Sequence, residues 1–373
     1  MSKTNSITEL RRLGQSVWLD QIDREMIRSG RLAHYRDLGV SGITANPTIF
    51  AKALEASDAY ADDIARRLGQ GKNAEAVVWD LLIEDVQAAA DVFRPVYDRE
   101  HGNDGFVSIE VSPDIAGDTE KTIAAARDLQ RRCARSNVMV KIPATPAGLP
   151  AIKAMTAEGA NINVTLIFAV ERYVKVVEAF LSGLEKLRAS GGDVSRVRSV
   201  ASFFVSRVDT KVDERLSQKI AETDGRRKAE LQSLLGKAAI ANSKLAYEMF
   251  AQLHSGQRWD RLREAGASVQ RCLWASTSTK NPSYRDTMYV EELIGPATVN
   301  TMPTTTLEAF MDHGRVAPTL QQDVEGARRL LDQLATNGID LAAITQELED
   351  EGVAGFAKSF RESIQHLSKV RTH

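Results

Sequence analysis

The chain has 373 residues, of which 43% are hydrophobic and 26% are charged, and its formal net charge is −2. This composition is typical of a globular protein with a sizeable core. The charge balance leaves no basic excess that could hold a nucleic-acid backbone, so we expect no nucleic-acid partner. No segment reaches the ~18 apolar residues that a membrane span needs, and the N-terminus lacks the apolar core of a secretory signal.

Cysteine and histidine usage favours a reducing compartment and gives no sign of a metal. The two cysteines, Cys133 and Cys272, form no CxxC motif and are too few for a disulfide framework, which predicts a cytoplasmic location. The six histidines show neither HxxxH nor HxH spacing, so no metal site is predicted. No GxGxxG motif follows an apolar run, so we expect no dinucleotide.

Eight short apolar runs with the composition of strands alternate with longer helical stretches. The runs span residues 17–22, 42–46, 106–111, 138–143, 162–168, 200–206, 271–277 and 297–302. Residues 169–188 form the clearest helix, because their apolar residues recur at spacings of three and four. Asp118 is expected to cap a helix that begins near Thr119. This alternation predicts an α/β protein with a parallel sheet, and eight strands favour a closed (β/α)8 TIM barrel.

Two connections and the C-terminal region are longer than a minimal barrel needs. Residues 51–105 and 207–270 each have room for more than one helix, and residues 320–373 are predicted to form helices outside the barrel. No Pro- or Ser-rich linker bounds these segments, so we predict a single barrel domain over residues 1–373 with helical insertions. We hypothesise that the C-terminal helices cover the mouth of the barrel.

Polar residues fall on one face of five predicted strands. Side chains alternate between the two faces of a strand, and in a barrel one face points into the lumen. The predicted inner polar set is Asp20, Thr44, Asn46, Ser108, Glu110, Lys141, Asn161, Asn163 and Thr165. Such a cluster costs stability in a core that is normally apolar. Function explains this cost most simply, because barrel active sites lie at the C-terminal strand ends.

Each of these residues also has a purely structural interpretation. Lys141 could extend from an edge to water, and Asp20 could cap the helix that follows it. Glu110 could be only the ionic partner of Lys141. Asn163 and Thr165 could satisfy backbone groups at a strand end. The joint pattern favours function, because several separate accidents would otherwise have to share one face.

The residue types predict the chemistry. A lysine confined in an apolar lumen loses hydration of its ammonium form, which makes the neutral amine available as a nucleophile towards a carbonyl. Two nearby carboxylates can carry protons in the two stages of such a reaction. A lysine with two acids and no metal ligands therefore indicates imine chemistry on a ketone or an aldehyde.

A series of short motifs runs from residue 17 to residue 303. They are VWLDQI (17–22), GITANPTIF (42–50), VSIEVSP (107–113), VMVKIPAT (138–145), INVTLIF (162–168), SFFVSRVD (202–209), WASTSTKNP (274–282) and YVEELIGPATVNTMP (289–303). Together, and in this order, they resemble the transaldolase family, and the length is similar to that of its longer bacterial subfamily. The resemblance implies a class I aldolase-type barrel.

The resemblance also implies four catalytic residues. Lys141, in VKIPAT, would form the Schiff base, and Asp20, in WLD, would be the general acid–base for carbon–carbon cleavage. Glu110, in SIEV, would act through a water while the imine forms and is hydrolysed. Thr165 would help to hold that water.

A substrate-binding set follows from the same resemblance. Its members are Asn46, Asn163 and Ser202 for the donor hydroxyls, and Arg207, Ser276 and Lys280 for the phosphate. Compact transaldolases have an arginine two residues after the phosphate-binding serine, where this chain has Ser278. We expect Lys280 to supply the missing charge, although a lysine does not bind phosphate in the bidentate manner of arginine.

The implied activity is transfer of a dihydroxyacetone unit between sugar phosphates, without a cofactor, in the pentose phosphate pathway. The donor would be sedoheptulose 7-phosphate or fructose 6-phosphate, and the acceptor glyceraldehyde 3-phosphate or erythrose 4-phosphate. Two alternatives stay open: a lyase similar to fructose 6-phosphate aldolase, and a catalytically silent barrel that binds sugar phosphates. The sequence does not decide between a monomer and a homodimer.

Overall fold

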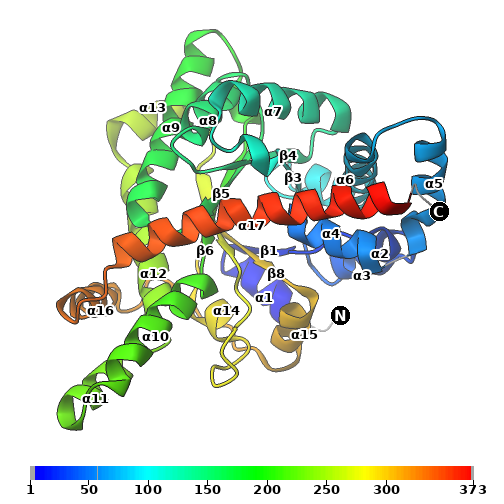
Figure 1. Cartoon of the computed structure of the whole chain (residues 1–373). Coiled ribbons are helices and arrows are strands. Elements are labelled where there is room, and N and C mark those ends of the chain that lie inside the picture. The colour runs from blue at the N-terminus through cyan, green and yellow to red at the C-terminus, as the bar shows by residue number, and fades with distance from the viewer. Residues whose placement is uncertain (1–4, 57, 371–373) are drawn as a thin grey trace.

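The computed structural model describes residues 5–56 and 58–370. Eight parallel strands form a closed barrel in chain order, because the first strand also pairs with the last. The strands are β1 (Gln15–Leu19), β2 (Gly42–Thr44), β3 (Val107–Glu110), β4 (Val138–Pro143), β5 (Ile162–Ile167), β6 (Ser199–Phe204), β7 (Gln270–Ala275) and β8 (Thr298–Met302). The predicted (β/α)8 TIM barrel is therefore confirmed (Figure 1).

Helices surround this barrel. Those of the N-terminal half are α1 (Ser6–Arg12), α2 (Arg24–Arg28), α3 (Arg31–Asp37), α4 (Pro47–Ala56), α5 (Ala61–Gly69), α6 (Ala74–Arg99), α7 (Thr119–Cys133), α8 (Gly148–Ala157) and α9 (Val170–Ala189). Those that follow are α10 (Ser206–Ala221), α11 (Gly225–Gln232), α12 (Ala238–Leu253), α13 (Gly256–Glu264), α14 (Met288–Glu292), α15 (Thr304–His313), α16 (Val324–Thr336) and α17 (Leu341–Val370). Short 3-10 helices are η1 (Asp58–Tyr60), η2 (Pro113–Ile115) and η3 (Val194–Arg196). Asp118 caps α7 as predicted, by accepting a hydrogen bond from the Lys121 amide.

All eight predicted strands exist, but six of them were expected to continue beyond their observed ends. The first predicted strand runs to residue 22, whereas β1 ends at Leu19, and the sixth runs to residue 206, whereas Ser206 already begins α10. Apart from Ser206, the residues beyond the observed ends belong to loops at the C-terminal end of the barrel. Their backbone leaves the sheet there, so strand-like composition overestimates strand length.

The apolar core lies between the strands and the surrounding helices. Val140 and Ile142 of β4 and Val164 of β5 are fully buried on the outer face of the barrel, where α7 and α8 pack. The opposite face of the same strands carries Lys141 and Asn163, also buried. The period-two alternation of strands thus separates an apolar outer face from a polar lumen.

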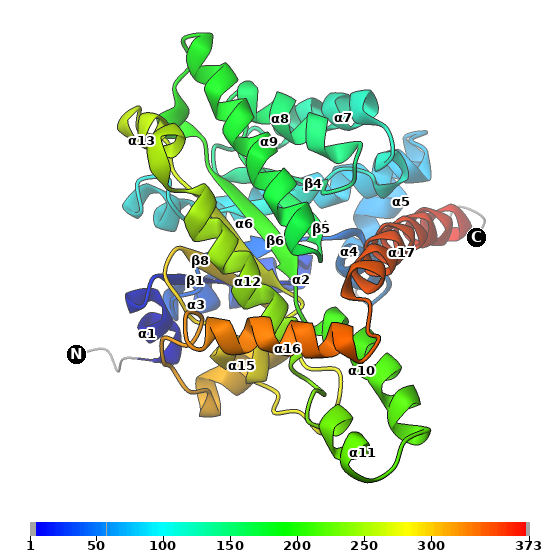
Figure 2. The same cartoon turned by 90° about the vertical axis from the view of Figure 1, so that its left-hand side faces the viewer.

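The long C-terminal helix α17 lies across the barrel (Figure 1). Its Gly352 packs so closely on β5 that a Cβ there would lie 2.8 Å from Leu166 Cδ2. Leu166 itself has a positive φ of 58° at a register shift in β5, which turns its side chain out of the regular alternation. The helix α16 packs on α12, and α10 and α11 project from the body of the protein (Figure 2).

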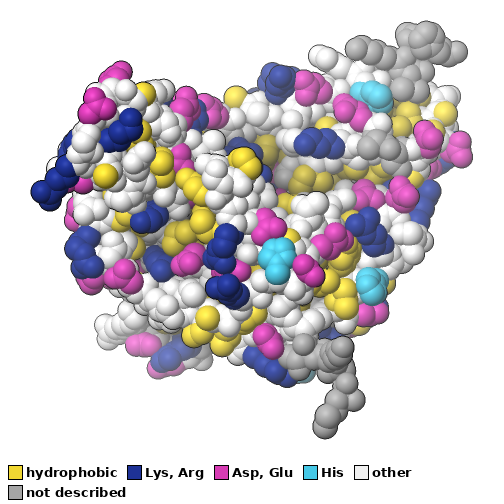
Figure 3. Space-filling model, turned by 90° about the horizontal axis from the view of Figure 1, so that it is seen from below, with side chains coloured by type: hydrophobic (Ala, Val, Ile, Leu, Met, Phe, Trp, Pro, Cys, Tyr) yellow, Lys and Arg dark blue, Asp and Glu magenta, His cyan; other side chains and the backbone are white. Residues whose placement is uncertain are grey.

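The molecular surface mixes charges of both signs. On the face seen in Figure 3, basic and acidic side chains are interspersed, as the formal net charge of −2 leads one to expect. Across the part of the chain that the structure describes, no helix combines the length and the apolar character needed to cross a membrane.

Candidate active site

A cavity of about 340 Å³ opens at the C-terminal end of the barrel, which we call the mouth. Eight of the ten predicted site residues line it: Asp20, Asn46, Lys141, Thr165, Ser202, Arg207, Ser276 and Lys280. The other two, Glu110 and Asn163, are buried beside Lys141 on the neighbouring strands β3 and β5. Barrel closure thus brings together residues from the first strand to the loop after the seventh.

Lys141 occupies the interior of the site because β4 lies between two strands that carry its neighbours. In the parallel register it is paired with Glu110 on one side and with Asn163 on the other. Lys141 is 4% exposed, and its Nζ lies 3.3 Å from Glu110 Oε2 and 3.4 Å from the Ala45 carbonyl oxygen, to which it donates. The interpretation in which Lys141 extends from an edge to bulk water is therefore wrong.

Two carboxyl groups share the surroundings of Lys141. Burial raises the pKa of Asp20, although the charge of Lys141 acts in the opposite direction. Burial also raises the pKa of Glu110, again against the attraction of Lys141. A carboxyl group with a raised pKa exchanges protons closer to neutral pH than an exposed one, which suits general acid–base catalysis.

Asp20 is held by hydroxyl groups and caps no helix. Its Oδ1 accepts a hydrogen bond from Thr44 Oγ1 at 2.8 Å, and Thr44 Oγ1 lies 2.8 Å from Thr301 Oγ1. The following helix, α2, is capped by Asp23. The capping interpretation of Asp20 is therefore wrong, and its carboxylate faces the cavity.

Asn163 and Thr165 differ in how their polar atoms are satisfied. Asn163 Nδ2 donates to Ser108 Oγ at 3.0 Å, and its Oδ1 accepts from Ser202 Oγ at 2.7 Å. Thr165 Oγ1 and both carboxylate oxygens of Glu110 are buried without a hydrogen-bond partner among the described residues. The contact of Glu110 with the lysine is an ion pair that lacks hydrogen-bond geometry. Neither Asn163 nor Thr165 uses its side chain to satisfy strand-end backbone, so that interpretation is wrong.

A group of cations lies at the rim of the cavity. The Arg207 guanidinium packs over the ring of Phe204, 5.5 Å from its centroid, and Lys280 Nζ donates to Ser278 Oγ at 2.6 Å. Burial lowers the pKa of Arg207, and burial together with the Arg207 charge lowers the pKa of Lys280. Within the described residues, no carboxylate oxygen lies within 4.0 Å of a nitrogen atom of either side chain, so neither forms a salt bridge. Two cations that line one cavity and form no salt bridge within the described residues favour an anionic ligand.

The cavity is also lined by residues that the sequence analysis did not assign, among them Lys52, Phe204, Thr301 and Phe356. Thr301 lies in a predicted strand, and a polar residue at such a position could have indicated the inner face of the barrel. Phe356 gave no signal, because nothing local distinguishes it from other apolar residues of α17. Its position shows that α17, one of the C-terminal helices, reaches the mouth; that these helices cover the mouth stays a hypothesis.

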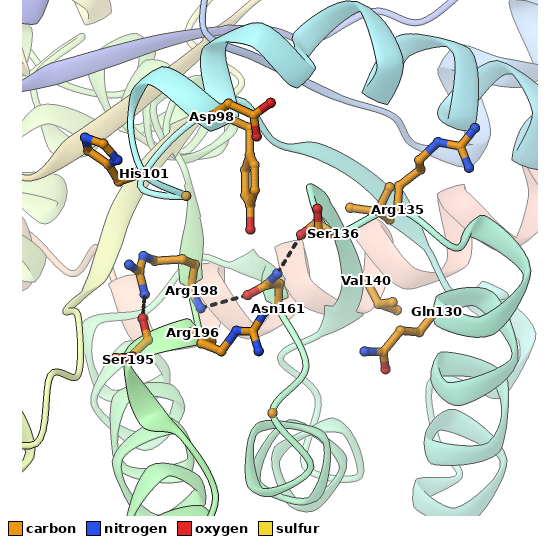
Figure 4. A pocket seen from close by; sticks show the side chains of 14 residues that line it. Asp98, His101, Gln130, Arg135, Ser136, Val140, Asn161, Ser195, Arg196 and Arg198 are labelled. Atoms are coloured by element: carbon orange, nitrogen blue, oxygen red, sulfur yellow. Dashed lines mark hydrogen bonds between the residues drawn. The ribbon is translucent and has the colours of Figure 1, made fainter.

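A larger cavity of about 590 Å³ lies at the opposite end, the foot of the barrel (Figure 4). Asn161, expected on the inner face with Asn163, lies here instead, because it precedes β5. Its side chain donates to the Ser136 carbonyl oxygen and accepts from the Arg198 amide. Arg198 also donates to the Ser195 carbonyl oxygen at 2.6 Å. No lysine lines this cavity within the described chain, so the larger cavity lacks the chemistry of the smaller one.

Comparison with known proteins agrees with the geometry of the mouth. The family model for transaldolase/fructose-6-phosphate aldolase matches residues 17–367. The chain belongs to this family. Over 97% of both chains it is 47% identical to a protein named transaldolase from Thermobifida fusca (strain YX). It is 49% identical to a transaldolase from Parafrankia sp. (strain EAN1pec), over 97% of this chain and 96% of the relative, and 42% identical to one from Trichodesmium erythraeum (strain IMS101), over 98% and 97%. The predicted family, and with it a transferase, is confirmed.

Proposed function

We propose that this enzyme transfers a dihydroxyacetone unit from a ketose phosphate to an aldose phosphate through a Schiff base on Lys141. The observation that carries the proposal is the position of Lys141: a buried amine next to Glu110, at the wall of a cavity that also holds Asp20. Imine formation requires an amine, and retro-aldol cleavage and imine formation both require carboxyl groups that exchange protons. The raised pKa values of the two carboxyl groups suit this task.

Imine formation uses Glu110. Its raised pKa allows it to take the ammonium proton, which leaves the neutral Lys141 amine to attack C2 of the ketose. The carbinolamine that results is protonated on its former carbonyl oxygen and loses water to give the iminium. The unpaired atoms of Glu110 and Thr165 support a water between them as the carrier of these protons.

Carbon–carbon cleavage uses Asp20. Its carboxylate takes the proton of the C4 hydroxyl as the C3–C4 bond breaks, and the bonding electrons move into the iminium to form an enamine on Lys141. The aldose formed from the distal carbons leaves. An acceptor aldehyde then enters, the enamine carbon attacks it, and Asp20 returns its proton to the new hydroxyl. Hydrolysis of the imine releases the new ketose.

The other predicted residues bind substrate. We assign the donor hydroxyls to Asn46, Asn163 and Ser202, and the phosphate to Arg207, Ser276 and Lys280. The hydrogen bonds of Asn163 with Ser108 and Ser202 support a fixed orientation of its amide. The unpaired cations Arg207 and Lys280 support an anionic group at the rim.

The same proposal includes sedoheptulose 7-phosphate or fructose 6-phosphate as donors, no cofactor, and a place in the pentose phosphate pathway. It also includes a cytoplasmic location. The two buried thiols, Cys133 and Cys272, are free, which supports a reducing compartment.

A lyase that releases dihydroxyacetone is the second candidate, because the matching family model covers both activities. The names of the curated relatives favour the transferase. The two activities are distinguished by incubating the enzyme with fructose 6-phosphate without an acceptor. Stoichiometric release of the aldose alone indicates a transferase, whereas continuous accumulation of free dihydroxyacetone indicates a lyase.

Borohydride trapping with fructose 6-phosphate, followed by peptide mapping, tests the Schiff base directly. A reduced three-carbon adduct on Lys141 is the expected result. Sugar binding without any adduct on the folded protein would overturn the proposed chemistry and favour a silent binding barrel.

A further inference from the structure

Two buried or half-buried carboxyl groups have no part in the proposed mechanism. Asp209, which is 1% exposed, and the half-buried Asp213 lie on α10 within two turns of Arg207. Burial raises the pKa of Asp209 to about 7 and also raises the pKa of Asp213. Both carboxylates are therefore costly to keep charged, and they need a structural or functional reason.

Each carboxylate accepts a hydrogen bond from a tyrosine of the segment that follows β7. The Tyr289 hydroxyl donates to Asp209 Oδ2 at 2.8 Å, and the Tyr284 hydroxyl donates to Asp213 Oδ2 at 2.6 Å. We call these four residues the tyrosine clasp. The clasp ties α10 to the loop after β7 through Tyr284 and to α14 through Tyr289.

Backbone groups hold the carboxylates of the clasp from the other side. The Ala239 amide donates to Asp209 Oδ1 at 2.7 Å, and the Gly236 amide donates to Asp213 Oδ1 at 2.9 Å. Gly236 has a φ of +68°, and a Cβ there would lie 2.6 Å from Tyr284 Cζ, so only glycine lets the tyrosine ring approach. The clasp is thus built into three segments of the fold.

The segment that the clasp holds carries two of the three proposed phosphate-binding residues. Residues 276–287, which include Ser276 and Lys280, form neither helix nor strand. Ser276 has a positive φ of 57°, and its Oγ lies 2.9 Å from the Oγ of Ser206, the first residue of α10. The segment is therefore fastened to α10 near its start by a serine pair and beyond its middle by the clasp.

A fastening is needed because the two main cations of the site repel each other. Arg207 and Lys280 line the same cavity, and the charge of Arg207 lowers the pKa of Lys280. No regular backbone structure holds Lys280 against this repulsion. An unfastened segment would relax by moving the exposed Lys280 away from Arg207.

We propose that the tyrosine clasp positions the phosphate-binding residues, because it holds Ser276 and Lys280 opposite Arg207. The clasp thereby sets the preference of the enzyme for phosphorylated over unphosphorylated sugars. This proposal rests on the proposed function. The clasp residues are positioning residues that do not touch the substrate.

The test uses Tyr284→Phe, Tyr289→Phe and the double variant in the full-length enzyme. Tyr35→Phe is the matched control, because the buried Tyr35 also donates to a carboxylate, Glu308 at 2.7 Å, but neither residue lines the cavity. We would measure kcat and KM with fructose 6-phosphate and with unphosphorylated fructose, each with the same acceptor, and the Kd of inorganic phosphate by calorimetry.

Each single clasp variant should raise KM for fructose 6-phosphate and the Kd of inorganic phosphate about three- to tenfold, and the double variant should do so more strongly. The kcat values, the kcat/KM for fructose and all constants of Tyr35→Phe should change less than about twofold. Equal losses with both sugars would overturn the proposal in favour of a purely structural role, as would unchanged constants in the double variant. Failure of the proposed function gives a different result: no borohydride adduct on Lys141 in the unmodified enzyme.

Discussion

The mouth and the foot of the barrel use similar residue types in opposite ways. At the mouth, burial raises the pKa of Asp20 and of Glu110. At the foot, a hydrogen bond from Arg135 holds the pKa of Asp91 below its usual value. A hydrogen bond from the Ser195 hydroxyl lowers the pKa of Asp193 in the same way. The carboxylates of the mouth are thus destabilised in their charged form, whereas those of the foot are stabilised.

The cavities at the two ends show the same contrast. At the mouth, buried polar atoms without hydrogen-bond partners among the described residues lie on Thr165, which lines the smaller cavity, and on Glu110, which lies behind Lys141. In the larger cavity at the foot, Asn161 and Arg198 use their polar groups in bonds to loops. Unsatisfied groups and raised pKa values are a better guide to a reactive site than cavity size.

The largest effect should come from removing the amine at the mouth. Lys141→Met removes the nucleophile while the raised pKa of Glu110 lets that carboxyl group become neutral, so the protein should still fold. Transaldolase activity should fall by about 10⁴-fold or more, with no borohydride adduct. Circular dichroism provides the folding control. Activity within tenfold of the unmodified enzyme would place the chemistry elsewhere.

Removing the carboxyl group of Asp20, the proposed acid–base catalyst, should block carbon–carbon cleavage after the imine has formed. Asp20→Asn keeps the shape of the side chain and an acceptor for Thr44, but it cannot take the C4 hydroxyl proton. We expect kcat to fall by about 10²- to 10⁴-fold. Borohydride should then trap the intact six-carbon sugar on Lys141 instead of a three-carbon unit. A three-carbon adduct formed at the normal rate would contradict the role of Asp20.

Removing a cation from the rim should weaken phosphate binding more than catalysis. Arg207→Ala should raise KM for fructose 6-phosphate by about ten- to a hundredfold, the range expected for lost charged hydrogen bonds. Unphosphorylated fructose should show little change. Steady-state kinetics with both sugars measures the effect, and an equal change for both would mean that Arg207 does not contact the phosphate.

Carboxyl groups at the two ends should contribute to the free energy of unfolding with opposite dependences on pH. Burial raises the pKa of Asp209 to about 7 in the folded protein, above the ordinary aspartate value of 3.8, so the folded state binds more protons than the unfolded state between these values. This contribution to stability is present below pH ~4 and lost as the pH rises to ~7, with a slope of at most about 1.4 kcal/mol per pH unit.

Asp209→Asn should therefore flatten the fall in stability between pH 4 and 7, as measured by urea unfolding at several pH values. Asp193→Asn at the foot is the control. The pKa of Asp193 is lowered, so any contribution it makes is lost as pH falls, and its replacement should leave this slope unchanged. An unaltered slope in Asp209→Asn would show that this carboxyl group is not the source.

The smallest effect is expected at the foot. Arg196 lines the larger cavity and is exposed, so Arg196→Ala should change the free energy of unfolding by no more than about 0.5 kcal/mol. The kcat/KM for fructose 6-phosphate should stay within about twofold. A larger loss of activity would show that the two ends are coupled.

Much of the barrel could be predicted from local patterns. The fourth strand, residues 138–143, matches β4, and the helix predicted at residues 169–188 matches α9 (Val170–Ala189). Alternation also placed Glu110, Lys141 and Asn163 on one inner face, because a side chain two residues along a strand returns to the same side. The strand ends were less well predicted, since composition does not show where backbone hydrogen bonds to the neighbouring strand stop.

The errors share one physical cause. Asn161 has the correct parity for the inner face, but it precedes β5 and therefore lies at the foot. Regular alternation would place Leu166 on the outer face with Val164, but the register shift in β5 interrupts that alternation. In both cases the face on which the side chain lies depends on where β5 pairs with its neighbouring strands. The local sequence does not show where that pairing begins or shifts.

The sequence by itself determined the barrel class, the family and the lysine with its two acids, because these depend on side-chain periodicity and residue type. Only the tertiary structure decided which groups meet. Asp20 accepts a hydrogen bond from Thr44, whose hydroxyl lies beside that of Thr301 because the barrel closes, and Phe356 reaches the cavity because α17 crosses the mouth. The tyrosine clasp likewise exists only after three segments pack together, since a hydrogen bond between distant residues depends on the positions of both backbones.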